Sequence, residues 1–156
     1  MIPRSSVTAG VQQLLESLTG RPVGRRTIPL NSEGKPVAPP YTILDPGPHT
    51  TSDGTLADAH TTAVSEYTAT FVSGPLPGVP NSRGGDEQAQ WMTDRGRKVV
   101  ERPADGSTRY THPLNIPGVT CSYREANEAG GTQDPEDGII TSVIRYRFHL
   151  EEATGA

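Results

Sequence analysis

The chain has 156 residues, a length that predicts one domain. Apolar residues make up 32% of it, and its 17 glycines and 15 prolines predict long loops around a compact core. The net charge of −4 argues against a protein that binds DNA non-specifically, because the affinity of such proteins comes from neutralising phosphates.

The first predicted element is a helix over about 6–19. Its apolar residues recur at helical spacing and form one stripe, made of Val7, Val11, Leu14, Leu15 and Leu18. A serine at its start and Gly20 at its end are typical helix boundaries. A short strand is expected around 25–30, followed by the turn-rich stretch NSEGKPVAPP.

Two strands are predicted in the middle of the chain. The stretch YTILD (41–45) forms the first, and a long loop over about 46–60 follows it. The second runs over 63–72 and has strict alternation. One side carries Ala63, Tyr67, Ala69 and Phe71, and the other carries Val64, Glu66, Thr68 and Thr70.

A second helix is predicted over about 85–101, despite Gly96 within it. Asp86 and Glu87 fall in its first turn, and basic residues gather at or just past its last. That distribution matches the helix dipole, whose positive end is the N-terminus. The stretch STRYTHPL (107–114) is expected to be a short strand or an extended segment.

The last part of the chain predicts two more strands that pair as neighbours. The first covers 118–126, with Val119, Cys121 and Tyr123 on one face, and a loop over about 126–138 follows it. The second starts at 139 and alternates most regularly of all. Its apolar side carries Ile144, Tyr146, Phe148 and Leu150, and its cationic side carries Arg145, Arg147 and His149.

This order of elements, helix, strands, helix, strands, predicts an α+β fold. We expect a mostly antiparallel sheet with two helices packed on one face. The whole chain, 1–156, is expected to form a single domain with flexible loops at about 46–60 and 126–138 and with short flexible termini.

Charge is segregated along the chain. Residues 36–82 include no Lys or Arg, although they include Asp45, Asp53, Asp58 and Glu66. Residues 125–137 are also free of basic residues and carry Glu125, Glu128, Asp134, Glu136 and Asp137. The basic residues cluster as Arg21, Arg25 and Arg26, and as Arg95, Arg97, Lys98 and Arg102. Such patches allow one copy to meet another, and solvated loops and a solvated helix face are the simpler alternative.

The sequence offers little sign of catalysis. No two of its four histidines stand at metal-ligand spacing, and neither a nucleophile elbow nor a phosphate loop is present. Cys121 is the only cysteine, and its place in a strand favours a buried, inert thiol over a nucleophile. We therefore predict no enzyme, no cofactor and no metal.

No stretch is long and apolar enough to cross a membrane, and the N-terminus has no signal-peptide core. The sequence therefore predicts a soluble protein made in the cytoplasm.

Several segments together carry a family resemblance: the amphipathic N-terminal helix, PYTIL, EYTATFVS, DEQAQWMTDRGRKVV and GIITSVIRYRFHLE. In order and length they resemble the tail terminator proteins of long-tailed, non-contractile bacteriophages, and especially those of phages that infect actinobacteria. The resemblance covers about 6–152 and depends on the order of elements, since none of the motifs is a catalytic signature.

The resemblance implies an α+β subunit of a hexameric ring without catalysis or a cofactor. The ring sits at the head-proximal end of the tail tube in the virion and is assembled in the host cytoplasm. It stops tube polymerisation and docks the tail to the head, and genomic DNA passes through its lumen without tight binding. Its partners are copies of itself, the tail-tube protein and a head-completion or neck protein.

On this basis we expect an interface formed by Arg145, Arg147, His149, Arg95, Arg97, Lys98, Glu125, Glu128, Asp134, Glu136 and Asp137. Asp45, Asp53 and Asp58 are expected to lie on loops at the lumen. The alternative for the arginines is a pair within the chain, in which Glu66 meets one of them across the sheet.

Other functions remain alternatives. One is a different head–tail connector ring, such as a head-closure, stopper or neck protein, and another is a tail-tube protein. A more distant alternative is a small metal-dependent hydrolase or ligand-binding domain that uses His49, Asp53 and His60. A DNA-binding regulator is disfavoured because the sequence lacks a basic face and a helix-turn-helix pattern.

Overall fold

The computed structural model describes residues 1–52, 61–75, 85–134 and 138–153. Over these residues the chain forms two α-helices, one 3₁₀ helix and a six-stranded sheet. The helices are α1 (Arg4–Thr19), α2 (Asp86–Arg97) and η1 (Lys98–Val100). The strands are β1 (Val23–Arg25), β2 (Tyr41–Ser52), β3 (Thr62–Ser73), β4 (Val119–Glu128), β5 (Gln133–Asp134) and β6 (Ile139–Glu152). The predicted α+β class is confirmed.

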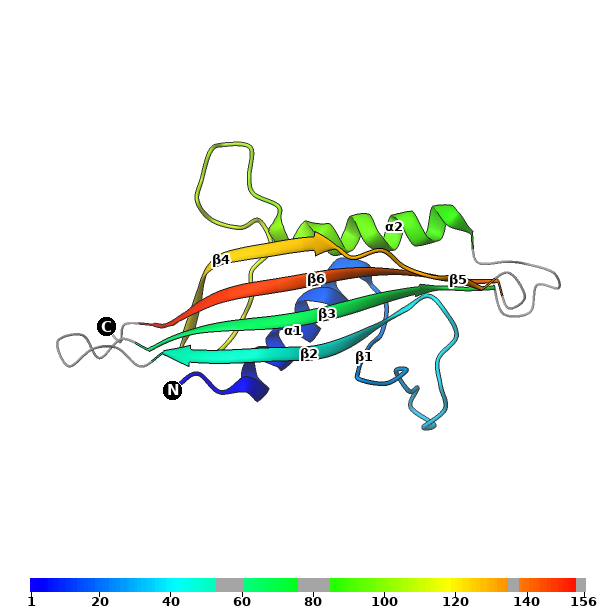
Figure 1. The fold of residues 1–156 in the computed structure, drawn as a ribbon, viewed down its shortest axis with the longest axis horizontal. Helices are drawn as coiled ribbons and strands as arrows, with labels where there is room; N and C mark the ends of the chain where they lie inside the picture. The colour runs from blue at the N-terminus through cyan, green and yellow to red at the C-terminus, as the bar shows by residue number, and fades with distance from the viewer. Residues whose placement is uncertain (53–60, 76–84, 135–137, 154–156) are drawn as a thin grey trace.

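The strands follow the order β1-β2-β3-β6-β4, and β5 pairs with the start of β6 (Figure 1). Only the short β1 runs parallel to its neighbour, β2, and the other pairings in the described sheet are antiparallel. The last strand therefore lies inside the sheet, between β3 and β4. The expected pairing of β4 with β6 is confirmed.

Both helices pack on the same face of the sheet, behind the strands in the view of Figure 1. The apolar stripe of α1 is buried against that face, as its spacing predicts. The strands contribute their predicted apolar sides, and Tyr67, Phe71, Ile144, Tyr146 and Phe148 are at most 2% exposed. The core is thus a single layer between the helices and the sheet.

Gly96 has a packing role that explains its place inside α2. A Cβ at this position would lie 2.4 Å from Cζ of Phe71 and 3.0 Å from the hydroxyl of Tyr146. The Tyr146 hydroxyl donates a hydrogen bond to the carbonyl oxygen of Gly96 at 2.7 Å. Burial raises the pKa of Tyr146 above its ordinary value, so the hydroxyl remains a donor. Glycine lets the helix backbone rest directly on the aromatic core.

The predicted loop over 46–60 is wrong for its first part, because β2 continues to Ser52, opposite Thr62. A bulge between Pro46 and His49 carries the strand past two prolines. Proline is tolerated at bulges because the missing N–H is not required there. Residues 53–60 lie outside the described residues.

The predicted loop over 126–138 is also wrong in part. Residues 126–128 belong to β4, and residues 133–134 form β5. Both segments pair with β6, which is long enough to hold β5 and β4 one after the other along the same edge. Residues 135–137 lie outside the described part of the chain.

Three smaller expectations also need correction. The first strand covers 23–25 instead of 25–30, because Arg26 adopts a left-handed conformation (φ 59°) that ends it. Residues 107–114 form bends and irregular segments without a strand. Tyr123 does not share a face with Cys121, because a bulge between them turns its ring towards the face opposite the helices.

Candidate interaction surface

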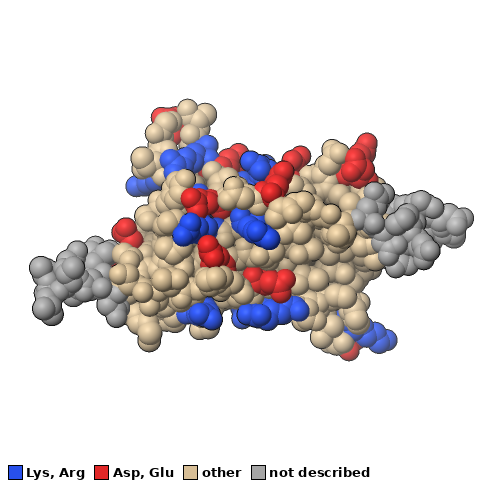
Figure 2. Space-filling model, in the orientation of Figure 1, with Lys and Arg blue, Asp and Glu red and all other residues tan. Residues whose placement is uncertain are grey.

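The face of the sheet opposite the helices is uncovered over its middle part and faces the viewer in Figures 1 and 2. We call this surface the open face. Its side chains come from the outward positions of four strands: Asp45 on β2, Val64, Glu66, Thr68 and Thr70 on β3, Arg145, Arg147 and His149 on β6, and Tyr123, Glu125 and Asn127 on β4. Charged side chains of both signs lie among each other on this face (Figure 2).

Arg147 lies between two carboxylates on the open face. The antiparallel register places it opposite Glu66 on β3 and opposite Glu125 on β4. Its Nε is 3.6 Å from Oε1 of Glu66, and one terminal nitrogen is 3.9 Å from Oε2 of Glu125. The alternative in which Glu66 pairs with an arginine of the same chain therefore holds for Arg147. These side chains are one-third to one-half exposed, so each pair contributes at most about 1 kcal/mol.

Arg145 lies two residues before Arg147 on β6 and has a different environment. Its register partners are Thr68 on β3 and Asn127 on β4, which are both neutral. Among the described residues it forms no ion pair, and its side chain is exposed beside a hollow that Gly47 and Pro48 also line. Arg145 is thus the arginine of the open face that remains available to a carboxylate from another molecule.

Three other basic residues of the predicted interface make side-chain contacts within the chain. Arg97 pairs with Glu128 at 3.3 Å, and Arg95 donates from Nε to the carbonyl oxygen of Leu18 at 2.6 Å. Lys98 lies half-buried in η1, and the ring of His149 packs against that of Tyr123 with 5.4 Å between centroids. The charge clusters that are separate along the sequence are therefore interleaved in the fold.

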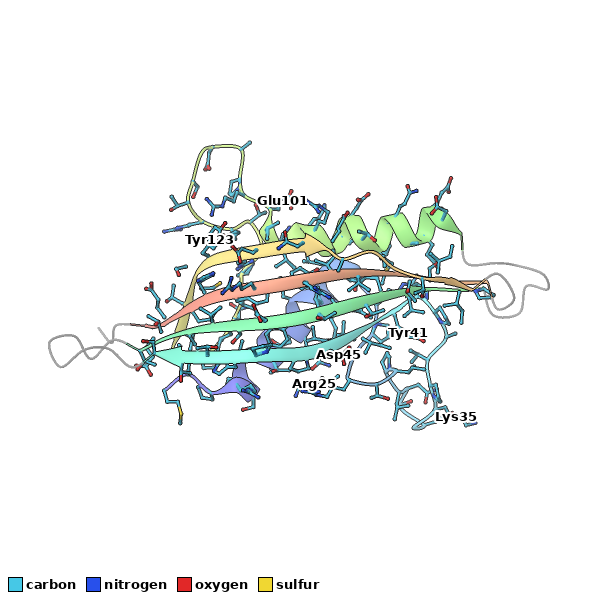
Figure 3. All side chains as sticks on the ribbon, viewed as in Figure 1. Arg25, Lys35, Tyr41, Asp45, Glu101 and Tyr123 are labelled. Atoms are coloured by element: carbon cyan, nitrogen blue, oxygen red, sulfur yellow. The ribbon has the colours of Figure 1, made fainter. Side chains whose placement is uncertain are left out.

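The structure describes only some of the acidic residues predicted for the interface and the lumen. Asp45 lies on the open face near the β2 edge, across the sheet from Tyr123 (Figure 3). The backbone of Asp134 pairs with Ile139, but its side chain is not described. Asp53, Asp58, Glu136 and Asp137 lie outside the described residues.

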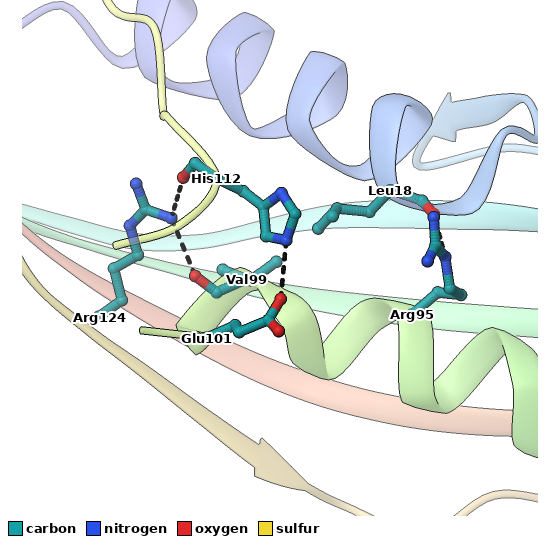
Figure 4. Close-up of polar contacts among 6 residues, drawn as sticks. All are labelled: Leu18, Arg95, Val99, Glu101, His112 and Arg124. Carbon is teal, nitrogen blue, oxygen red and sulfur yellow. Dashed lines mark hydrogen bonds and ion pairs between the residues drawn. The ribbon is translucent and has the colours of Figure 1, made fainter. Parts of the chain in front are cut away.

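Arg124 forms a buried latch that the sequence analysis missed (Figure 4). Its side chain is 6% exposed, and one terminal nitrogen donates to the carbonyl oxygens of Val99 and His112, both at 2.8 Å. The guanidinium also lies over the ring of Tyr110, 4.5 Å from its centroid. Residues 101–112 form an excursion of the chain, and a contact of 2.8 Å between Nε2 of His112 and Oε2 of Glu101 joins its two ends. Residues 101–112 are thereby fixed against β4.

Three exposed apolar side chains were also missed. Ile28 and Leu30, 38% and 59% exposed, belong to a projecting hairpin over residues 27–38, which we call the hairpin arm. Val37 donates from its N–H to the carbonyl oxygen of Pro29 at 3.0 Å within this arm. Trp91 on α2 is 45% exposed. It is the only tryptophan of the chain and lies outside the buried stripe of Ala89 and Met92, and that signal was present in the sequence.

No metal or nucleophile site emerges in the described part of the chain. There, no group of three or more His, Cys, Asp and Glu side chains could hold a metal ion. The ring nitrogens of His49 contact Oγ of Ser65 and the carbonyl oxygen of Ile2, so this histidine is already engaged. Burial raises the pKa of the Cys121 thiol, which disfavours the reactive thiolate.

The described helices include none long and apolar enough to cross a membrane.

A scan against protein-family models finds no match for this chain, and a search of curated proteins finds no relative.

Proposed function

We propose that this chain is a structural subunit of a bacteriophage tail, a tail terminator that forms a hexameric ring on the head-proximal end of the tail tube. One observation carries the proposal. Both helices pack on one face of the sheet, and the opposite face, with Arg145 unpaired among the described residues, stays exposed. An antiparallel sheet tolerates water on such a face, so the face is free to serve as a contact surface in an assembly.

The chemistry of the open face suits a subunit that stays dissolved until it meets its site. The charges around Arg147 are compensated within the chain, so the face does not attract copies of itself indiscriminately. Arg145 offers a guanidinium with no ion-pair partner in the described part of the chain, and such a group binds carboxylates in a bidentate manner. We assign the contact at Arg145 to an acidic residue of the tail-tube protein or of the adjacent ring subunit.

The further partners follow from the same role. The ring stops tube polymerisation, presents a surface to a head-completion or neck protein, and lets the genome pass through its lumen in the virion. A net charge of −4 favours passage over retention of DNA, because phosphates are repelled. The acidic residues assigned to the lumen are Asp45, Asp53 and Asp58.

Two other tail or neck roles compete with this one. Another head–tail connector ring would attach to the portal side instead of the tube, and a tail-tube protein would stack into filaments on its own. A metal-dependent hydrolase is less favoured, because both ring nitrogens of His49 already have contacts within the fold.

The test is negative-stain electron microscopy of the purified protein, alone and mixed with isolated tail tubes. Rings that cap one end of each tube support the proposal. Long filaments from the protein alone would favour a tube subunit, and protein that ignores tube ends would overturn the terminator role.

Two variants make the test specific. Arg145→Glu reverses a charge that has no ion-pair partner among the described residues, so folding should persist while capping is lost. Arg109→Glu applies the same charge change on the exposed 101–112 excursion and should cap tubes as the wild type does. Equal capping of tubes by both variants would show that Arg145 is not part of the contact.

A further inference from the structure

We propose that successive subunits of the ring join head to tail, with the cationic edge of one subunit docked on the α2 face of the next. The cationic edge consists of Arg25, Arg26 and the hairpin arm, and the α2 face consists of Glu87, Trp91 and Asp94. This inference rests on the proposed ring and names the two surfaces that form it.

The arginines of the cationic edge are held in place by neutral groups. Arg25 donates from Nε to Oε1 of Gln12 at 2.6 Å, and Arg26 donates from a terminal nitrogen to the carbonyl oxygen of Pro46 at 3.3 Å. Neither forms an ion pair with any described residue, and both are exposed. Their orientation is fixed while their charge is left uncompensated, which is the arrangement that an incoming carboxylate requires.

The backbone at Arg26 points to the same surface. Within the described residues it is the only non-glycine residue with a positive φ, at 59°. Its N–H donates to the carbonyl oxygen of Leu44 at 2.9 Å, so the strained residue is anchored to β2 and turns the chain out into the hairpin arm. Strained backbone of this kind concentrates at functional sites. The arm then exposes Ile28 and Leu30 beside the arginines.

The α2 face has the complementary character. Glu87, Trp91 and Asp94 are spaced so that they share one side of the helix, and all three are exposed. Neither carboxylate is paired with a Lys or Arg among the described residues. Arg95 lies over the indole ring, 5.9 Å from its centroid, but it is bound to α1 through the carbonyl oxygen of Leu18. Tryptophan is enriched among the residues that contribute most to the binding energy of protein interfaces.

The two surfaces lie on opposite sides of one subunit. The hairpin arm projects below β2 in Figure 1, whereas α2 lies above β4 in the same view. Arg25 and Lys35 mark the cationic side in Figure 3. The two surfaces of one subunit therefore cannot contact each other. Two different patches that match each other generate a ring when the rotation between copies closes.

Charge reversal with rescue tests this pairing. The first variant combines Arg25→Glu with Arg26→Asp, since Asp tolerates the left-handed conformation of residue 26 better than most residues. The second combines Glu87→Arg with Asp94→Arg. Each variant alone should weaken ring formation at least tenfold by analytical ultracentrifugation, and the chain that carries all four substitutions should assemble again. Circular dichroism and thermal melting verify that each variant is folded.

The matched control is Arg109→Glu, which should leave assembly unchanged. Trp91→Ala should weaken assembly at least tenfold by removing the apolar anchor. Wild-type assembly in the first and second variants, or failure of the fourfold variant to recover although it is folded, would overturn the pairing.

The outcomes separate this inference from the proposed function. If the wild type neither forms rings nor caps tubes, the proposed function fails and the inference fails with it. If the wild type caps tubes and both charge-reversal variants do so equally well, only the inference fails. Loss of duplex DNA binding by the first variant with assembly unchanged would assign the cationic edge to nucleic acid instead and would also overturn the inference.

Discussion

Replacing Gly96 with alanine should destabilise the protein, although alanine is the better helix former. Propensity alone favours Ala by about 1 kcal/mol in a helix interior. The new Cβ would lie 2.4 Å from Cζ of Phe71, which is 1% exposed and has no room to turn aside. Overpacking of a closed core costs about 1–3 kcal/mol, and a contact this short lies at the upper end. We expect a net loss of about 2 kcal/mol.

Thermal and urea unfolding followed by circular dichroism measure this effect. In a domain of this size, a loss of about 2 kcal/mol lowers Tm by roughly 4–8 °C. The propensity difference is measured in the same helix by comparing Gln90→Gly with Gln90→Ala, since residue 90 is exposed. There the Ala variant should be the more stable by about 1 kcal/mol.

A double-mutant cycle identifies the contact responsible for the loss. Phe71→Leu removes the ring atoms that lie nearest to residue 96, so the cost of Gly96→Ala should fall in that background. A Gly96→Ala protein at least as stable as the wild type, with the usual difference between the two Gln90 variants, would refute the packing argument.

Three further predictions concern buried and paired groups. Arg124→Met should cost roughly 3 kcal/mol in urea unfolding and speed proteolysis within 101–118, because two backbone carbonyls lose a charged donor; unchanged stability would contradict the latch. A Glu66–Arg147 double-mutant cycle should give a coupling below about 1 kcal/mol that disappears in concentrated salt, because the pair is half-exposed. The Cys121 thiol should alkylate more slowly in the folded than in the unfolded chain, since its pKa is raised in the fold. The contribution of the protonated Cys121 thiol to the free energy of unfolding should be complete below the pKa of the unfolded thiol and lost as pH rises through the pKa of the folded thiol. In Cys121→Ala, this part of the pH dependence of the free energy of unfolding should disappear.

The face of each long strand could be predicted from the sequence because side chains alternate with a period of two. Phe71 and Tyr146 are buried and Glu66 and Arg147 are outward, as the alternation predicts. Burial of the α1 stripe follows in the same way from the helical period. Periodicity therefore gave the fold class and the core.

The bulges could not be predicted, because one extra residue reverses the alternation without a signature of residue type. The bulge before Tyr123 moves its ring to the open face, and the one after Pro46 extends β2 through a stretch that contains two prolines. Turn-forming residues favour a loop there, and pairing with β3 overrides that preference.

The candidate surface was only partly predictable because pairing across strands depends on register. Glu128 and Arg97 lie far apart in the sequence and meet in the fold, so the expected segregation of charge is lost. Arg124 is a further example, since a charged residue in a strand gives no sign that it will be buried against backbone carbonyls. The outward position of Arg145 was predictable, but its lack of a partner in the described chain was not.

The place of β6 between β3 and β4 has a consequence for synthesis on the ribosome. The residues that join the two halves of the sheet, 139–152, are translated after every other described strand. Until they leave the exit tunnel, β3 has a free edge and β4 has no neighbour, so the core cannot close. Folding must then be late and dominated by distant contacts, which slows it. During that interval the open edge of β3 is the site most exposed to wrong pairing with another nascent chain.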